Sequence, residues 1–496
     1  MKTSTILSTA LAVGVTLAVG MGSLHFRGGL GRLDPVANSS AAVASSTSGS
    51  AVTATGDARA VKQPSVPSTV CATVKSRLAG SDGSFRAAAE KTPPDTSRIQ
   101  AAITSCERSA GEVAVRLTTS GSDGAFLSGP LTIGRGVVLV LEPGVTLYAS
   151  RNARNYGTYC GTITSSEKGC TPFITVDGNN SGIDGVRSAA GQGIIDGRGG
   201  DKILGTSTTW WTLAAQAKAK GGNQNNFRLI YAKNASNFTL YDIDLENSPN
   251  FHVVYQRGTG FTAWGVYIHT PANARNTDGI DPGDGAKNIT IENSYIADGD
   301  DGIAIKGATA TSNISIIGDH FYGTHGISIG SETNGGVTNV LVAKDTITGR
   351  GVNNTASTSA NGLRIKSDAS RGGKVSDVSY TNICMTRLKY PLDFDTHYSS
   401  SSGSKFPYFT GIQLNGVKSV SSVSGAKSVF DGYSSAYPLG IVLEHVALDT
   451  TAYTAEYASV GLDATNVKPS GTGVSTHSVS ATGSVPACAF PVFPAM

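Results

Sequence analysis

Short segments that alternate apolar and polar residues fill the middle of the chain, with turn-forming residues between them. Many begin with an asparagine followed by an apolar–polar–apolar triplet. Because successive side chains of a strand point to opposite faces, these triplets predict short, half-buried β-strands. The clearest phrases begin at Asn237, Asn288, Asn313 and Asn339, and a related phrase begins at Gly260.

These phrases recur at a regular interval, and each one begins roughly 25 residues after the one before it. A period in the twenties with strand-like phrases is typical of a solenoid in which each turn stacks on its neighbour. Three strands and three turns per coil give a parallel β-helix, an all-β fold, and we expect the asparagines to stack along one turn. N-glycosylation is the alternative explanation of these phrases, since all but the last read N-x-S/T. A β-propeller is the alternative fold, but its blades need about 40–50 residues.

One helix is predicted before the β region, over residues 95–107. Asp95 or Thr96 can cap its N-terminus. A single helix at this place suggests a cap over the exposed end of the β-helix. Its apolar residues fall on one face: Ile99, Ala102, Ile103 and Cys106.

The N-terminus predicts export. Lys2 followed by an apolar run over residues 6–21 resembles a secretory signal peptide. A short membrane anchor is the alternative, but the run is shorter than the ~20 apolar residues that a spanning helix needs. We therefore divide the chain into a signal peptide (1–22), a low-complexity linker or pro-segment (23–68) and a β-helix domain (69–496), secreted and free of the membrane after processing.

Composition adds limits on partners and redox state. Glycine makes up 61 of 496 residues, roughly 12% against about 7% in average proteins, as expected for a turn-rich fold. The net charge of +3 is too small to argue for nucleic acid as a partner. Six cysteines suit disulfides in an exported protein, no CxxC zinc motif occurs, and fifteen pairings stay open. They stand at positions 71, 106, 160, 170, 384 and 488.

The stretch 276–306 carries the candidate chemistry, with six aspartates. Asp300 lies 12 residues after Asn288, and His325 lies 12 residues after Asn313. The repeat therefore predicts equivalent positions for Asp300 and His325 on neighbouring coils, ~4.8 Å apart.

Two cations and a further carboxylate join this stripe. Asp278 precedes the pair Asp300–Asp301 by about one coil. Arg364 and Lys366 enter the same column if a polar insertion around residues 351–360 is looped out. Asp281, Asp284 and Asp298 are predicted to shape turns.

Each of these residues also has an ordinary explanation. Asp-Gly clusters are commonly turns, a lone histidine is commonly structural, and alternating cations are common on a solvated face. A calcium loop is excluded, since the EF-hand template fails from its fifth position. The shared position in the repeat favours a site, because independent explanations would otherwise have to coincide.

Four motifs resemble the signature blocks of the polygalacturonases of glycoside hydrolase family 28, with closest similarity to the bacterial endo-acting members. They are NTD at 276–278, GDDGIAIK at 299–306, THGISIGSE at 324–332 and RIK at 364–366. The resemblance covers nearly all of residues 71–460. Thr324 departs from the pattern, since many members have glycine before the histidine.

The resemblance implies a right-handed parallel β-helix that hydrolyses α-1,4 linkages of polygalacturonic acid (pectin) with inversion. Asp300 is then the general acid, and Asp278 and Asp301 hold and deprotonate the attacking water. His325 shares a hydrogen bond with the acid. The expected substrate-binding residues are Arg364, Lys366 and Tyr398.

The resemblance further implies the disulfides Cys71–Cys106 and Cys160–Cys170, with Cys384 and Cys488 left open. No cofactor or metal is expected, the partner is the polysaccharide, and we expect a monomer. Three alternatives stay open: an exo-polygalacturonase, a calcium-dependent pectate lyase, and a β-helical polysaccharide-binding adhesin. Stacked coils suggest carboxyls nearer 5 Å apart than the ~6.5–9.5 Å usual for inversion, so the stereochemistry rests on the resemblance.

Overall fold

The structure is a computed structural model that describes residues 53–79, 83–109 and 111–495. The predicted signal peptide (1–22) and residues 23–52 of the predicted linker lie outside these ranges. Among the described residues, no helix is both long and apolar enough to cross a membrane.

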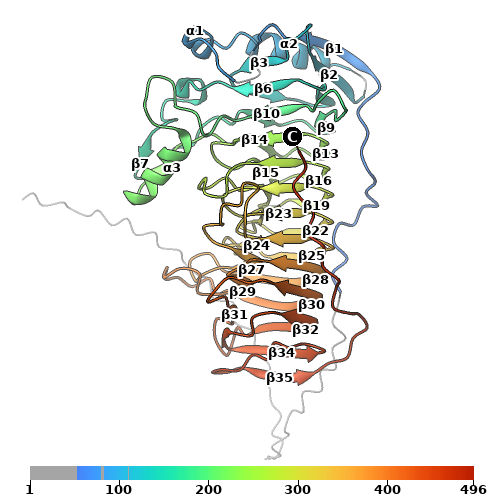
Figure 1. Ribbon diagram of the computed structural model, residues 1–496, viewed down its shortest axis with the longest axis vertical. Helices are drawn as coiled ribbons and strands as arrows, with labels where there is room; N and C mark the ends of the chain where they lie inside the picture. The colour runs from blue at the N-terminus through green and yellow to red at the C-terminus, as the bar shows by residue number, and fades with distance from the viewer. Residues whose placement is uncertain (1–52, 80–82, 110, 496) are drawn as a thin grey trace, which may run out of the picture. The chain divides into compact units, whose positions relative to one another are not determined.

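Two long sheets of parallel strands run along the molecule and form the predicted right-handed parallel β-helix (Figure 1). One sheet has 11 strands, stacked in chain order. Its strands are β4 (Leu131–Ile133), β8 (Ile174–Val176), β12 (Ile230–Lys233), β15 (Val253–Gln256), β18 (Ile280–Gly283), β21 (Ile303–Ile305), β24 (Ile327–Gly330), β27 (Asn361–Lys366), β29 (Tyr390–Asp395), β31 (Ser428–Asp431) and β33 (Tyr453–Glu456).

The other sheet has 22 strands, because in most coils it holds the two remaining strands. Its strands are β1 (Val70–Lys75), β2 (Val113–Thr118), β3 (Ala125–Ser128), β5 (Val137–Leu141), β6 (Thr146–Ala149), β9 (Ser181–Gly185), β10 (Ile194–Asp196), β13 (Phe238–Tyr241), β14 (Asp244–Glu246), β16 (Thr259–Trp264), β17 (Tyr267–His269), β19 (Lys287–Glu292), β20 (Tyr295–Ala297), β22 (Thr311–Ile317), β23 (His320–Tyr322), β25 (Val337–Ala343), β26 (Thr346–Thr348), β28 (Lys374–Thr386), β30 (Tyr408–Val420), β32 (Leu439–Leu448), β34 (Ala458–Asp463) and β35 (Ser475–Ser478).

Helices are few among the described residues. The predicted capping helix is α2 (Thr96–Cys106), which packs on the first coil and buries Ile99 and Ile103. The expected side-chain cap is absent, because Asp95 instead accepts a hydrogen bond from Leu127 N at 2.8 Å and pairs with Arg98. The remaining helical elements were not predicted: α1 (Ala87–Lys91), the 3-10 helix η1 (Ala153–Tyr156) and α3 (Trp210–Ala219).

The predicted repeat period matches the residue pairing between neighbouring coils. Phe238 pairs with Phe261, which pairs with Ile289, and Ile289 continues to Ile314 and Val340. Each of these residues directly follows the first residue of one phrase, so the register advances by the same intervals as the phrases, as predicted. Aliphatic and aromatic side chains stack in the same order inside and form one continuous core.

The predicted asparagine stack is also present. Asn313 Nδ2 donates to Asn288 Oδ1 and Asn339 Nδ2 to Asn313 Oδ1, both at 2.9 Å. These asparagines adopt positive φ, a conformation that asparagine tolerates better than most residues. The stack is broken at Gly260, where a Cβ would lie 2.6 Å from Asn237 Oδ1.

The described end of the predicted linker lies against the β-helix. Thr55 N and Gly56 N donate to Asn339 Oδ1 at 2.8 and 3.0 Å. Asp57 Oδ2 accepts from Thr290 Oγ1 at 2.8 Å. Residues 54–63 thus form a strap along the coils rather than a free linker, because each coil offers it a side-chain partner.

All six cysteines form disulfides. Cys71–Cys106 and Cys160–Cys170 are the pairings that the resemblance implied. Cys384–Cys488, which the sequence left open, ties the C-terminal segment to β28. That segment continues to Phe493, whose ring packs against three tyrosines of the 22-stranded sheet: Tyr267, Tyr295 and Tyr322.

Candidate active site

The predicted site residues gather beside the 11-stranded sheet, at the turns where its strands begin. Ile280 pairs with Ile303, and Ile303 pairs with Ile327. The residues two positions earlier in each coil, Asp278, Asp301 and His325, therefore lie in one column. The predicted equivalence of Asp300 and His325 is off by one residue, because the turn before β21 holds one residue more than the turn before β24.

Arg364 and Lys366 lie on β27, not in that column. Arg364 pairs with Ser328 and Lys366 with Gly330, so both side chains project from the outer face of the sheet next to the column. Their long side chains nevertheless reach the carboxylate of Asp301. Lys366 Nζ lies 2.6 Å from Asp301 Oδ2, and Arg364 lies 3.8 Å from Asp301 Oδ1.

Asp300 is held by three donors. Its Oδ1 accepts from Asp301 N and from His325 Nδ1, both at 3.0 Å. Its Oδ2 accepts from Asn276 N at 3.3 Å. The other ring nitrogen of His325 lies 2.8 Å from Thr358 Oγ1, in the polar insertion that the sequence analysis looped out. The imidazole is thus fixed from both sides.

The pKa values of the three carboxyl groups are shifted in different directions. Burial acts to raise the pKa of Asp300, but the hydrogen bond and charge of His325, and the charge of Lys366, outweigh it and hold the pKa below its ordinary value. Burial also acts to raise the pKa of Asp301, but the positive charge of nearby Lys366 outweighs it. The pKa of Asp301 is therefore lower than its ordinary value. The pKa of Asp278 is raised well above its ordinary value by burial and by nearby Asp300 and Asp281. Of the three, Asp278 therefore keeps its proton to the highest pH in the free protein.

The aspartates predicted to shape turns behave differently from one another. Asp284 lies in a turn with φ of 49°, as predicted. Asp298 is buried, and its Oδ1 accepts from Asp300 N at 2.9 Å. Asp281 lies in β18, contrary to the prediction, and burial raises its pKa to about 7 against the opposing charge of Lys306. It therefore belongs to the electrostatics of the site.

Tyr398 covers the two cations from the solvent side. Its ring centre lies 5.2 Å from the guanidinium carbon of Arg364 and 5.2 Å from Lys366 Nζ. Its side chain is 40% exposed. A sugar ring that lies on this tyrosine would have its substituents within reach of both cations.

One open pocket of about 610 Å³ contains all seven predicted catalytic and binding residues. Sequence reasoning missed several supporting residues. Ser328 Oγ donates to Asp301 Oδ1 at 2.8 Å, and Asp393 pairs with Arg364 at 2.9 Å. Lys306 also lines the pocket. The outward positions of the alternating strands could have identified these residues.

Asp300, Asp301 and His325 also offer three ligand atoms within 4.8 Å of one another, a spacing that could hold a metal ion. Lys366 already occupies one oxygen of Asp301, and His325 Nδ1 is engaged with Asp300. These donors form ion pairs and hydrogen bonds among themselves, which compete with a metal.

Comparison with known proteins places the chain among its relatives. An endo-polygalacturonase of Pectobacterium parmentieri is 43% identical over 399 residues, which cover 79% of this chain and 90% of that protein. A polygalacturonase of Ralstonia solanacearum is 41% identical over 443 residues, covering 79% and 80%. The solved polygalacturonase of Erwinia carotovora ssp. carotovora superposes with a TM-score of 0.70 at 40% identity, covering 83% of this chain and all of that one. Residues 145–465 match the glycosyl hydrolases family 28, and the chain belongs to that family.

Proposed function

We propose that this protein is a secreted endo-polygalacturonase, which hydrolyses α-1,4-galacturonosidic bonds within polygalacturonate. The observation that carries the proposal is the close approach of two buried cations, Arg364 and Lys366, to the carboxylates of the column. A glycosidase needs paired carboxyls, and a uronic acid substrate needs cations beside them. The names of the relatives above support the same substrate and endo action.

Asp300 is the general acid in this mechanism. It protonates the leaving glycosidic oxygen while the bond from the anomeric carbon to that oxygen breaks. The attacking water forms the new bond to the anomeric carbon and gives its proton to Asp278 or Asp301. His325 is a positioning residue, because it orients Asp300 and influences its protonation.

Asp300 must carry a proton before the reaction, although in the free protein its pKa is lowered and that of Asp278 is raised. Besides His325, Lys366 lowers the pKa of Asp300, and Lys366 and Arg364 both lower the pKa of Asp301. A substrate carboxylate paired with these cations cancels that effect, and the pKa of Asp300 rises. Binding of the correct substrate thereby favours protonation of the acid.

The stereochemistry is proposed to be inverting. Both oxygens of Asp301 are occupied in the free protein, one by Lys366 and one by Ser328. A carboxylate held in this way is better suited to orient a water than to attack the sugar itself. The donors of Asp301 thus support inversion despite the small spacing of the carboxyls.

The alternatives require different chemistry. A pectate lyase needs calcium and a base for proton abstraction, whereas here the cations at the carboxylates are Arg364 and Lys366. An adhesin gives no reason for a buried carboxylate trio beside those cations. An exo-acting enzyme would release mono- or disaccharides only, so early products that form a series of oligomers would exclude it.

Export and a monomeric state are part of the proposal. Three disulfides suit an oxidising compartment. The proposed order is a signal peptide over 1–22, a linker over 23–68 and a catalytic domain over 69–496. N-terminal sequencing of the protein recovered from culture medium tests the first boundary, and a start before residue 22 contradicts it.

Asp300→Asn tests the assigned acid. The variant should lose reducing-end release on polygalacturonate by roughly a hundredfold or more, because the leaving oxygen has no proton donor. Asp284→Asn is the matched control, since Asp284 lies in a turn where asparagine also tolerates a positive φ. It should keep the activity of the wild type. Full activity of Asp300→Asn would refute the assignment.

A further inference from the structure

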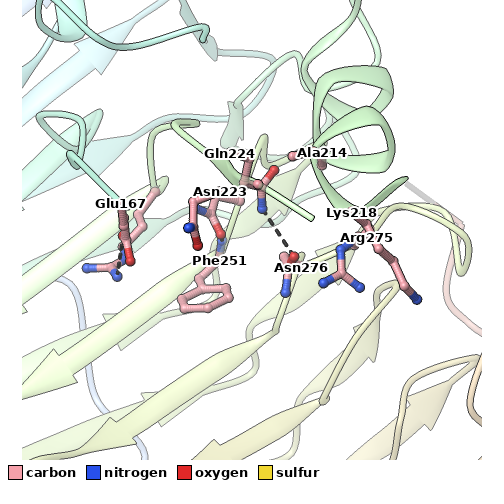
Figure 2. Close-up of a pocket in the computed structure, with 12 residues that line it drawn as sticks. Glu167, Ala214, Lys218, Asn223, Gln224, Phe251, Arg275 and Asn276 are labelled. Carbon is pink, nitrogen blue, oxygen red and sulfur yellow. Dashed lines mark hydrogen bonds and ion pairs between the residues drawn. The ribbon is translucent and has the colours of Figure 1, made fainter. Parts of the chain in front are cut away.

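A second cavity of about 270 Å³ opens beside the active-site pocket. Figure 2 shows the residues of this cavity, which come from α3, from the short strand β11 (Asn223–Gln224), from the loop at Glu167 and from the turns before β12, β15 and β18. Four residues line both cavities, so the two are continuous: Lys218, Phe251, Arg275 and Asn276.

The lining is positively charged. Lys218, Arg228 and Arg275 contribute three positive charges and Glu167 one negative charge, a net charge of +2. Arg228 lies 3.7 Å from Glu167, whose side chain is 61% exposed. In the ranges that the structure describes, neither Lys218 nor Arg275 forms an ion pair. Two cations thus face the cavity without a carboxylate partner.

Amide groups and an aromatic ring complete the lining. Gln224 Nε2 donates to Asn276 Oδ1 at 3.2 Å, as the dashed line in Figure 2 shows. This bond connects the turn before Asp278 to the strand after α3. Phe251 offers an apolar face, and the guanidinium of Arg228 lies 5.4 Å from its ring centre. Cations, amide donors and one aromatic face suit an acidic sugar.

The stack fixes where the cavity lies relative to the chemistry. Ile230 pairs with Val253, and Val253 pairs with Ile280. The residues two positions earlier, Arg228, Phe251 and Asp278, therefore lie in successive coils, and Arg228 is about 10 Å from Asp278 along the stack.

The cavity lies on the opposite side of Asp278 from β27, which carries the two substrate-binding cations of the active site. In the proposed mechanism Asp278 and Asp301 hold the water that attacks the anomeric carbon, and Asp300, about one coil nearer to β27 than Asp278, protonates the leaving oxygen on the opposite side of that carbon. Sugar units on the cavity side therefore precede the cleaved bond, toward the non-reducing end of the substrate.

We propose that this cavity is a distal subsite, in which Lys218 and Arg275 bind the carboxylate of a galacturonosyl unit on the non-reducing side of the cleaved bond. The subsite rests on the proposed function, since it takes the same polymer. It favours longer chains, and it favours free carboxylates over methyl esters, because an ester carries no charge to pair with the cations.

The double variant Lys218→Gln/Arg275→Gln tests the subsite. Its kcat/KM is measured on oligogalacturonates of increasing length. The ratio of kcat/KM for long over short substrates should fall at least roughly tenfold, because the loss of one charge-assisted hydrogen bond weakens binding by about that factor. Lys220→Gln is the matched control, because Lys220 lies at the end of the same helix, is exposed and lines neither cavity. An unchanged length preference in the double variant would overturn the proposal.

A binding measurement separates this proposal from the proposed function. Long and short oligogalacturonates are titrated into Asp300→Asn with and without the double substitution. Weaker binding of the long oligomer alone supports the subsite, and equal weakening or none overturns it. If the wild type releases no reducing ends from polygalacturonate, the proposed function fails whatever the titration gives. If the wild type is active but the double variant keeps its length preference, only the subsite fails.

Discussion

Replacing Lys366 by glutamine removes the shortest ion pair of the active site. Lys366 Nζ lies 2.6 Å from Asp301 Oδ2, and the two side chains are only 7% and 2% exposed. At that distance two unit charges attract by about 6 kcal/mol in a medium of effective dielectric constant about 20. The cost of burying both charges offsets much of this attraction.

Breaking a buried ion pair from one side costs about 3–5 kcal/mol in general, because the remaining charge stays buried. Asp301 keeps Ser328 as a hydrogen-bond donor and Arg364 at 3.8 Å. We therefore expect Lys366→Gln to lower the free energy of unfolding by about 3 kcal/mol at pH 7, the lower end of that range.

The expected loss depends on pH. The pKa of Asp301 is lower in the folded protein than its ordinary value. The stabilising contribution of the pair is therefore present above the unfolded pKa of about 4 and is lost as the pH falls through the folded pKa. The difference between wild type and variant should be full at pH 7 and should shrink below about pH 4.

Guanidinium unfolding at several pH values measures the difference. Lys374→Gln is the matched control, because Lys374 is exposed at the start of β28, and a change within about 0.5 kcal/mol is expected there. In an Asp301→Asn background, Lys366→Gln should cost far less. Equal midpoints for Lys366→Gln and Lys374→Gln, or an undiminished cost in the Asp301→Asn background, would refute the reasoning.

The same substitution tests the electrostatics of catalysis. Lys366 lowers the pKa values of Asp300 and Asp301, so its loss lets these groups take up protons at higher pH. The acidic limb of the pH profile of kcat/KM, which reports the free protein, should move to higher pH. An acidic limb that stays in place would mean that Lys366 does not set the protonation of the site.

Two further predictions concern the C-terminus and the stereochemistry. Cys384→Ser opens a disulfide that spans 104 residues, and the free energy of unfolding should fall by about 4 kcal/mol, while kcat at ambient temperature is kept because the bond ties down a segment outside the active-site pocket. Unchanged stability in denaturant titrations would contradict that role of the bond. Proton NMR of early hydrolysis should detect the β anomer of the new reducing end first, since inversion acts on an α linkage. An α anomer formed first would show retention.

The repeat explains why so much of the fold was predictable. Each coil contacts mainly its two neighbours, so the fold is encoded in a local phrase that recurs along the chain. The spacing from Asn288 to Asn313 predicted both the register and the asparagine stack, and the structure contains both. The count along the repeat also brought Asp278, Asp300 and His325 into one predicted stripe, and the resemblance to glycoside hydrolase family 28 supplied their roles.

Only the tertiary structure decided what the repeat does not encode. One extra residue in the turn before β21 aligned His325 with Asp301 instead of Asp300, and a count from Asn288 cannot detect such an insertion in a turn. The excursion over residues 197–229, which carries α3 and the charged cavity, has no counterpart in the period. The sequence determined the stacking of the coils through short-range contacts. The strap at residues 54–63 and the Cys384–Cys488 bond required the structure, because their contacts join segments far apart in the chain, which no pattern within a single coil can pair.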